Sequence, residues 1–295
     1  MSKVIVIRGG TGGIGYQAAL MIALMPEKHT VVITGRSAGS AEKAVSSLKE
    51  ESSNENIHYA IGDMSKQSGV KKLAKDLLSR FTKIDELCNN AGNLTVGGER
   101  VNTEDGVDEN IAVNVIAPCM LTRLLVPDLK AASPTGKVQI TTGGLPIGNL
   151  DLDDIESQKG STNGLQRYSH SKRVMEAMCI ALARELQPEG ISVNVVGGGL
   201  PGANSMTSVV SFSELPWFMK AVYPCFSAFM HRDDKGKSAK ACAKPTVWAT
   251  QQTAESIGSG NNHTMGEPKK EKWRKNVSKE ENQARVMEFI SQKMK

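Results

Sequence analysis

A tyrosine and a lysine with a spacing typical of proton-transfer chemistry lie in the second half of the chain. Tyr168 and Lys172 occupy positions i and i+4 of a predicted helix, so their side chains lie on one helix face. A nearby ammonium favours the phenolate and lowers the pKa of a tyrosine from ~10 toward the working pH range. The pair would then act as a general acid and base, although an ordinary helix-face pair has the same spacing.

A glycine cluster near the N-terminus predicts a nucleotide-binding loop. Residues 8–15 read RGGTGGIG, between an apolar strand-like run and a helical segment. Glycines let the backbone approach a pyrophosphate, and the helix N-terminus supplies free N–H groups and a positive dipole end. The glycines fit several registers, and a plain glycine-rich turn is the alternative. The residues expected to contact the cofactor are Gly9, Thr11, Gly12, Gly13, Ile14 and Gly15.

The end of the second predicted strand indicates which dinucleotide would bind. Arg36 stands where an NAD-binding fold usually carries Asp or Glu for the ribose 2′-OH. A cation there accommodates a 2′-phosphate, which favours NADP(H) over NAD. A solvated surface arginine is the alternative interpretation. Asp63 and Met64, after the third strand, are expected to contact the adenine, and a surface turn is the competing interpretation.

Strand-like and helix-like segments alternate along most of the chain, which predicts the frame for these residues. Alternating strands and helices with right-handed crossovers give a parallel sheet with helices on both faces. We therefore predict an α/β, doubly wound Rossmann-type fold in a single domain over residues 1–295. Strands are expected at 4–7, 31–33, 57–61, 84–88, 137–142 and 191–196, and helices at 14–25, 40–51, 66–81, 107–131, 168–187, 238–250 and 278–293.

Composition excludes several classes of protein. The net charge of +5 comes from residues 231–295, which hold 14 Lys/Arg and 8 Asp/Glu. No apolar run approaches the ~20 residues that span a bilayer, which excludes an integral membrane protein. The five cysteines contain no CxxC pair and the five histidines have no ligand spacing, so we expect neither disulfides nor a metal site. A strand beginning at residue 4 leaves no room for a leader, which predicts a soluble protein in a reducing intracellular compartment.

The motifs, taken together and in order, resemble those of the short-chain dehydrogenase/reductase family. They are the glycine loop, Asp63, the run Asn89-Asn90-Ala91-Gly92, Asn114 and the Tyr168-x-x-x-Lys172 pair. The Asn-Asn-Ala-Gly run matches the classical branch of that family. Residues 148–155, the long spacing from them to the tyrosine and residues 257–293 resemble the retinol dehydrogenase and WW-domain oxidoreductase group.

The resemblance implies a role for each matched residue. Tyr168 would be the general acid and base at the substrate oxygen, and Lys172 would bind the nicotinamide ribose and lower the tyrosine pKa. Asn114 would help to hold a water molecule of the proton relay. The remaining residues implied to line the cofactor site are Asn90, Ala91, Gly92 and Gly199.

The sequence departs from the family pattern at three places. The family's carbonyl-binding serine aligns with Gly143, and the neighbouring Thr142 hydroxyl would point to the other side of a regular strand. Thr142 is the candidate for this catalytic role because its hydroxyl lies one residue away. The loss of such a donor can cost ~10²–10³ in rate, so impaired or specialised chemistry is the alternative. Residues 197–199 are all glycine where the family has Pro-Gly, which predicts a looser loop. Arg8 replaces the usual Thr, and would either add positive charge near the phosphates or point to solvent.

The segment 200–235 concentrates the aromatic residues. In the family this region covers the substrate, so we interpret it as a lid over a hydrophobic, bulky substrate. The alternatives are burial against the body or a second subunit, as in a homo-oligomer, and contact with a membrane surface. Six of the 13 aromatic residues lie within 18 positions: Phe212, Trp217, Phe218, Tyr223, Phe226 and Phe229.

Residues 266–295 are expected to form a polar, lysine-rich surface segment and a terminal helix. The basic run 269–275 raises the question of nucleic-acid binding, but Glu271 interrupts it and the chain carries no nucleic-acid fold signature. A solvated basic loop without a nucleic-acid partner is therefore the prediction.

These observations lead to two hypotheses of different classes. The first is an NADP(H)-dependent oxidoreductase that moves hydride between the nicotinamide and a carbonyl or alcohol carbon of a hydrophobic substrate. The second is an NADP(H)-binding sensor or scaffold with little turnover, and Gly143 is its motivation.

Overall fold

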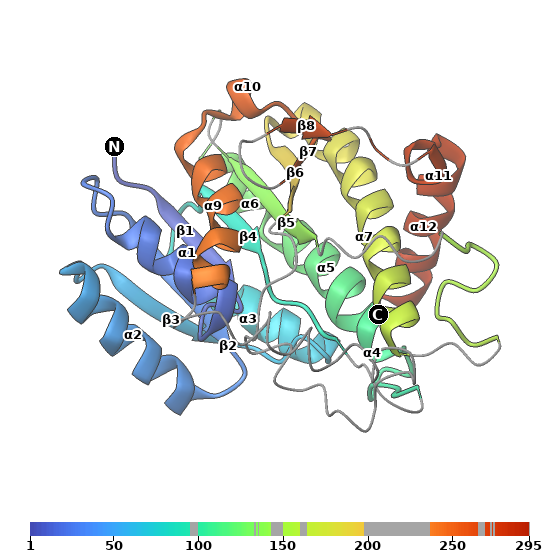
Figure 1. Ribbon diagram of the computed structural model, residues 1–295, viewed down its shortest axis with the longest axis horizontal. Helices are drawn as coiled ribbons and strands as arrows, with labels where there is room; N and C mark the ends of the chain where they lie inside the picture. Colours follow the sequence, from blue (N-terminus) through green and yellow to red (C-terminus); the bar gives the residue numbers. More distant parts are fainter. Residues whose placement is uncertain are drawn as a thin grey trace.

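One sheet runs through the part of the chain that the computed structural model describes, which is residues 1–94, 100–132, 134, 136–142, 150–159, 164–197, 237–264, 269–271, 273 and 275–294 (Figure 1). Its strands are β1 (Val4–Arg8), β2 (Thr30–Gly35), β3 (Ile57–Ile61), β4 (Glu86–Asn89), β5 (Lys137–Thr142), β6 (Ser192–Gly197), β7 (Asn262–Thr264) and β8 (Lys269–Glu271). The order in the sheet is β3-β2-β1-β4-β5-β6-β7-β8. The first seven of these strands pair in parallel, and β8 pairs antiparallel to β7.

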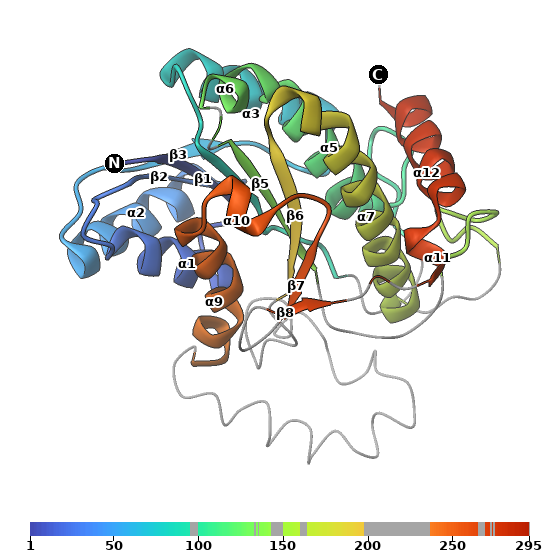
Figure 2. The same ribbon diagram turned by 90° about the horizontal axis from the view of Figure 1, so that it is seen from above.

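Helices cover both faces of the sheet (Figure 2). One face packs against α1 (Gly13–Ala23), α2 (Ala38–Ser52) and α9 (Lys237–Gln251), and the other against α3 (Gln67–Arg80), α5 (Ala117–Leu124) and α7 (Gly164–Leu186). Alternation along β1 produces this division, because Ile5 and Ile7 face the α1 side while Val6 faces the α3 side. The predicted doubly wound α/β fold is confirmed.

The order of the strands reverses at β1 and β4. The chain runs from β1 outward through β2 to β3, crosses back to β4 on the opposite side of β1, and continues through β5 to β6. In open α/β sheets, ligands bind outside the carboxyl ends of the strands at such a switch point. Residues that follow β1 and β4 are therefore the ones that the topology brings to a binding crevice.

The helix predicted over 107–131 forms over residues 109–131, but a π turn and the residue Leu125 divide it into four consecutive pieces that the sequence did not predict. They are α4 (Glu109–Ile111), a π-helical turn (Ala112–Ile116), α5, and α6 (Val126–Ala131). Pro118 has no N–H for the Asn114 carbonyl, and the Ala117 N–H bonds five residues back to Ala112 instead. Pro127 likewise stands at the start of α6. The π turn widens the backbone at Asn114.

The six predicted strands all form, but two short strands were missed in the C-terminal region. β7 and β8 have three residues each and no apolar alternation that identifies a strand. Part of the lysine-rich segment therefore pairs with the sheet edge through β8, and the Trp273 indole donates to the Gly260 carbonyl at 2.9 Å. The terminal helix forms as α12 (Glu280–Lys293), which packs against α7 after the short α11 (Lys275–Ser278).

A buried charged pair anchors α9 to the sheet. Lys137 of β5 lies 3.2 Å from the fully buried Glu86 of β4, and its ammonium also donates to the carbonyls of Ala249 and Gln252 at the end of α9. Thr250 donates to the same carboxylate at 2.8 Å. A cation at a helix C-terminus is favourable. Across the described residues, no helix is both long and apolar enough to cross a membrane.

Candidate functional site

The glycine loop passes directly over the carboxyl ends of β1 and β4. Gly9 has a φ of +81°, and a Cβ there would lie 2.7 Å from the Ala91 Cβ. A Cβ on Gly15 would lie 2.1 Å from the Gly9 carbonyl oxygen. Only glycine fits at positions 9 and 15. The absence of side chains there lets α1 pack closely against the loop that follows β4.

The N-terminus of α1 is open to an anion. Its first residue outside the helix, Gly12, provides no side-chain cap, the first turn carries no acidic residue, and the space where a Gly12 Cβ would stand has no atom within 4 Å. Uncapped N–H groups and the helix dipole favour a phosphate at such a position. The backbone of this loop therefore fits the diphosphate of the dinucleotide that the sequence predicts.

The residues after β2 and β3 form the next part of this edge. Arg36 is exposed, and Ser37 stands at the N-terminus of α2 without a side-chain hydrogen bond to cap it. Partial burial of Asp63 acts to raise the pKa of its carboxyl, but hydrogen bonds from Ser65 and the Arg36 charge outweigh burial and lower that pKa. Arg36 and Asp63 thus lie close enough to interact at the position predicted for the adenosine end.

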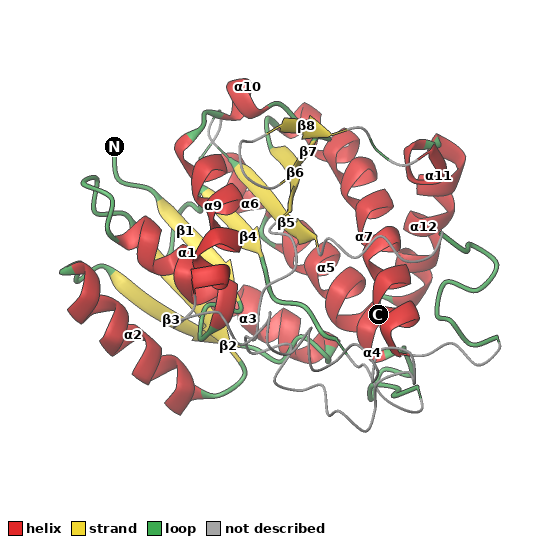
Figure 3. Cartoon of the chain, viewed as in Figure 1, coloured by secondary structure: helices red, strands yellow, loops and turns green. Residues whose placement is uncertain are grey.

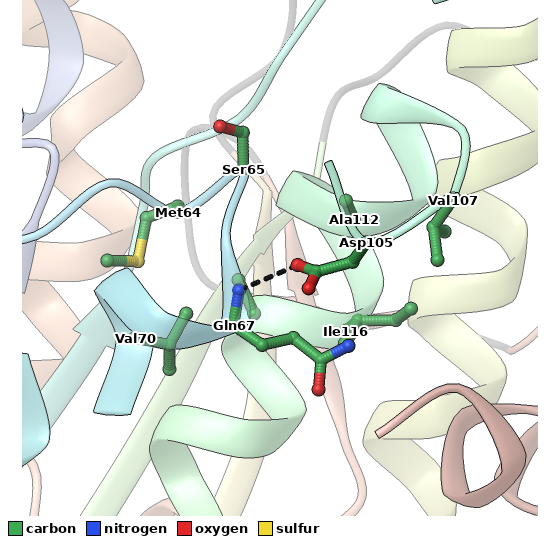
Figure 4. A pocket seen from close by; sticks show the side chains of 9 residues that line it. Met64, Ser65, Gln67, Val70, Asp105, Val107, Ala112 and Ile116 are labelled. Atoms are coloured by element: carbon green, nitrogen blue, oxygen red, sulfur yellow. Dashed lines mark hydrogen bonds between the residues drawn. The ribbon is translucent and has the colours of Figure 1, made fainter. Parts of the chain in front are cut away.

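Met64 lines a small pocket beside this edge (Figure 4). The pocket lies between the start of α3 and the π turn, and the Gln67 N–H donates to the Asp105 carboxylate at 2.8 Å beside it. None of its lining residues belongs to the glycine loop or to the Tyr168–Lys172 pair. They are Met64, Ser65, Gln67, Val70, Asp105, Val107, Ala112, Ile116 and Ala117.

Arg8 is buried, so the expectation that it points to solvent was wrong, while an added positive charge near the phosphates stays a prediction. Its side chain is 1% exposed. One guanidinium nitrogen donates to the Val113 carbonyl of the π turn at 3.0 Å, and another donates to the Ala91 carbonyl. The Arg8 carbonyl in turn accepts the Ala91 N–H at 2.7 Å. Burial lowers the Arg8 pKa to about 9.

Asn114 connects the loop after β4 to α7. Its amide nitrogen donates to the Asn93 carbonyl at 3.0 Å and to the Ser171 hydroxyl at 2.9 Å, and its amide oxygen accepts the Asn93 N–H at 2.8 Å. Ser171 donates onward to the Tyr168 carbonyl at 2.7 Å. The sequence did not predict Asn93 or Ser171 as site residues. The position of Ser171 within the Tyr168–Lys172 turn is the signal that could have identified it.

Tyr168, Lys172 and Gly92 meet beside Asn114. The Lys172 ammonium lies 5.7 Å from the centre of the Tyr168 ring and donates to the Thr141 carbonyl at 3.2 Å. A Cβ on Gly92 would stand 3.3 Å from that ammonium and 3.2 Å from the Asn114 amide oxygen. In the described part of the chain, the Tyr168 hydroxyl has no hydrogen-bond partner, although the Tyr168 carbonyl accepts the Ser171 hydroxyl.

The pKa values of the pair differ from the expectation that the ammonium lowers the pKa of Tyr168. Burial raises the Tyr168 pKa to about 12, because a desolvated phenolate is costly. Burial, together with the positive charge of Arg8, lowers the Lys172 pKa to about 7, and Glu176 only partly opposes this. Desolvation of both groups therefore outweighs their mutual effect.

The Thr142 side chain faces α7, and its hydroxyl is hydrogen-bonded there. Its hydroxyl donates to the Glu176 carboxylate at 3.1 Å, and one Arg173 nitrogen lies 2.7 Å from each oxygen of that carboxylate. All three side chains are buried. The i,i+3 spacing of Arg173 and Glu176 in the helix is the sequence signal that could have predicted this ion pair. Gly143, Gly199 and the segment 200–235 with its six aromatic residues lie outside the described residues.

Comparison with known proteins gives sequence relatives of one kind. Residues 3–144 match the family model described as short chain dehydrogenase. Retinol dehydrogenase 13 of Homo sapiens is 27% identical over 198 residues, which are 67% of this chain and 59% of that protein. Polyprenol dehydrogenase of Homo sapiens is 28% identical over 204 residues, covering 67% and 60% respectively. The matched part of the chain spans less than two thirds of the length of these relatives.

Solved structures share the fold at low sequence identity. An uncharacterized protein from Mycobacterium paratuberculosis superposes with a TM-score of 0.72 at 18% identity, over 99% of this chain and 93% of that one. The Pseudomonas aeruginosa RhlG complex with NADP has a TM-score of 0.59 at 20% identity, over 89% and 94%. An NADH-dependent reductase complexed with NAD has a TM-score of 0.60 at 19% identity, over 90% and 95%. The similar structures thus include complexes with either dinucleotide.

The Lys172 pKa predicts a pH dependence of stability. The folded pKa of about 7 lies below the usual 10.5, so between these values the unfolded chain binds a proton that the folded chain does not. Stability from this group therefore rises with pH, by up to about 1.4 kcal/mol per pH unit. We expect Lys172→Met to lose this slope between pH 7 and 9 in urea unfolding followed by circular dichroism.

The control for this experiment is Lys75→Met, which removes an exposed lysine of α3. It should keep the slope of the unchanged protein. Equal slopes for Lys172→Met and the unchanged protein would contradict the lowered pKa.

Proposed function

Because the chain belongs to the short-chain dehydrogenase/reductase family, we propose that it is an NADP(H)-dependent oxidoreductase acting on a carbonyl or alcohol carbon of a hydrophobic substrate. The observation that carries the proposal is the convergence of Tyr168, Lys172, Asn114 and Gly92 next to the glycine loop at the switch point. This arrangement joins a dinucleotide-binding edge to a tyrosine whose hydroxyl is available for a ligand.

The proposed cofactor contacts follow the carboxyl edge of the sheet. The glycine loop and the α1 N-terminus would bind the diphosphate, Arg36 would bind the 2′-phosphate, and Asp63 and Met64 would contact the adenine. When bound, the nicotinamide supplies or accepts the hydride. The residues proposed for its end of the site are Asn90, Ala91, Gly92, Tyr168, Lys172 and Gly199.

Tyr168 is the proposed general acid in the reducing direction. A tyrosine with a pKa of about 12 holds its proton at neutral pH and can give it to a carbonyl oxygen that gains negative charge. Lys172, with a pKa of about 7, carries its proton part of the time at neutral pH and would help to restore that of Tyr168. Asn114, held by Asn93 and Ser171, would orient a water molecule of the relay.

A lipophilic alcohol or its carbonyl product is the proposed substrate class. Support comes from the names of two relatives, which specify retinol and polyprenol, and from the six aromatic residues of the segment 200–235. That segment is proposed to cover the substrate. Burial against a second subunit and contact with a membrane surface remain the competing roles for it.

A second candidate function is NADP(H) sensing or scaffolding with little turnover. It is favoured by the position of the Thr142 hydroxyl, whose single proton goes to Glu176, and by Gly143 at the place of the family serine. Thr142 would have to release Glu176 before it could donate to a substrate oxygen. The two candidate functions share the cofactor and differ in whether the protein shows catalytic turnover that depends on Tyr168.

Tyr168→Phe tests the choice between them. We expect the oxidoreductase to consume NADPH with a panel of hydrophobic aldehydes, ketones and quinones, and Tyr168→Phe to lose at least about a hundredfold in kcat because its general acid is gone. Tyr59→Phe, which removes an exposed hydroxyl bonded to Glu42, is the matched control and should keep full activity. NADPH binding without Tyr168-dependent turnover on any member of the panel would favour the sensor.

Arg36→Ala tests the cofactor. Without the cation, the 2′-phosphate loses a charge-assisted contact, and we expect the Kd for NADPH to rise about tenfold while that for NADH stays within about twofold. Fluorescence titration of both nucleotides measures this. Arg80→Ala, which removes an exposed arginine of α3 paired with Asp76, is the control. An unchanged NADPH to NADH ratio in Arg36→Ala would refute the assignment.

Gly143→Ser tests whether the missing hydroxyl limits the chemistry. A serine here restores the donor found in the family, and removing one such donor elsewhere costs about 10²–10³ in rate. We expect kcat of Gly143→Ser to rise at least about tenfold in steady-state assays. Gly143→Ala adds the Cβ without the hydroxyl and should give no rise. Equal kcat for the serine and alanine variants would rule out a limiting role of this hydroxyl.

A further inference from the structure

Arg8 lies among the catalytic elements without an acidic partner. The described residues offer it no ion pair, and burial is the sole cause of its lowered pKa. Its hydrogen bonds go to backbone carbonyls of two separate segments, Ala91 after β4 and Val113 in the π turn. A buried arginine without a carboxylate is costly, so a compensating role is to be expected.

The Val113 carbonyl needs a donor because of the π turn. In an α-helix it would accept the Ala117 N–H, but that N–H bonds to Ala112. A continued π-helix would use the N–H of residue 118, which is a proline and has none. The guanidinium of Arg8 thus satisfies a carbonyl that the local backbone leaves open, one residue before Asn114.

We propose that Arg8 is a positioning residue of the oxidoreductase centre, tying the turn that carries Asn114 to the loop that carries Ala91 and Gly92 and adding a second buried cation near Lys172. The inference rests on the proposed function for its catalytic meaning, but its physical content does not. Arg8 binds both backbone polar groups of Ala91. Its own carbonyl accepts the Ala91 N–H, and its side chain donates to the Ala91 carbonyl. Ala91 in turn contacts Gly9.

The charge of Arg8 acts on Lys172. The groups that face this lysine are Arg8 from β1, the Thr141 carbonyl from β5, Asn114 from the π turn, and Tyr168 and Glu176 from its own helix. Tyr168 is neutral at neutral pH, and Glu176 is paired with Arg173. Arg8 is therefore the main cation that favours loss of the Lys172 proton, beyond the effect of burial.

Two substitutions test the positioning of the turn and the effect on Lys172. Arg8→Met removes both the donors and the charge with similar length, whereas Arg8→Lys keeps one amine donor but loses the planar fork that reaches two carbonyls. Arg123→Met, at a partly exposed arginine paired with Glu185, is the control. Hydrogen exchange by mass spectrometry on peptides covering 109–120, and the pH dependence of urea unfolding with and without Lys172→Met, need neither cofactor nor turnover.

We expect both Arg8 variants to exchange at least about tenfold faster in 112–117 than the unchanged protein, with β1 and β4 unaffected. In Arg8→Met, the Lys172-dependent change in stability should begin about one pH unit higher, because the cation that acts on Lys172 is gone. With a carbonyl substrate, kcat should fall in both variants while the Kd for NADPH changes less than about threefold. If Arg8→Met fails to fold, Arg8→Lys still tests positioning by exchange.

Exchange that rises equally over the whole chain, with an unmoved Lys172 transition in Arg8→Met, would overturn the inference and leave Arg8 a purely structural residue. Absence of turnover in the unchanged protein would defeat the proposed function, yet the exchange and unfolding results would still decide whether Arg8 holds this turn and acts on Lys172.

Discussion

The close approach of three backbones at the carboxyl ends of β1 and β4 is the constraint on which the site depends. Gly9, Gly15 and Ala91 lie so near one another that any side chain beyond hydrogen on either glycine would overlap its neighbour. This contact fixes the start of α1 relative to the loop after β4. The same loop lies against Lys172 and Asn114 at Gly92, and Asn93 bonds to Asn114. The proposed phosphate-binding and proton-transfer ends of the site are thereby joined at one edge of the sheet.

Burial determines the electrostatics of this edge more than the charges in it do. A tyrosine beside a lysine in water would favour the phenolate, but here both side chains are 5% exposed and both charged forms are penalised. The resulting centre keeps Tyr168 protonated and makes Lys172 the group that titrates near neutrality. The buried Arg8 strengthens this arrangement, because a second cation makes the lysine proton easier to lose.

What the sequence predicted, and what it did not, follows from the range of the interactions involved. The six main strands and the Tyr168–Lys172 pairing are recorded in local patterns, the β-branched runs and the i,i+4 spacing. The π turn depends on one proline within a helical pattern, and the burial of Arg8 depends on a carbonyl that exists only because of that turn. Glu86 in β4 is similar, since its partners come from β5 and α9, 51 and 164 residues away along the chain. Patterns within one element do not contain such information.

The cluster of Thr142, Glu176 and Arg173 decides whether the Thr142 hydroxyl is free to donate to a substrate. Arg173 holds both carboxylate oxygens of Glu176, which fixes the acceptor in the path of the Thr142 proton. Turning that hydroxyl toward a substrate would leave a buried carboxylate with one hydrogen bond fewer, a cost of about 1–3 kcal/mol. Thr142 can therefore donate to a substrate oxygen only by leaving a buried ion pair. In the proposed reduction, the Tyr168 proton would therefore neutralise more of the developing charge than it would in a site where a free serine shares that charge.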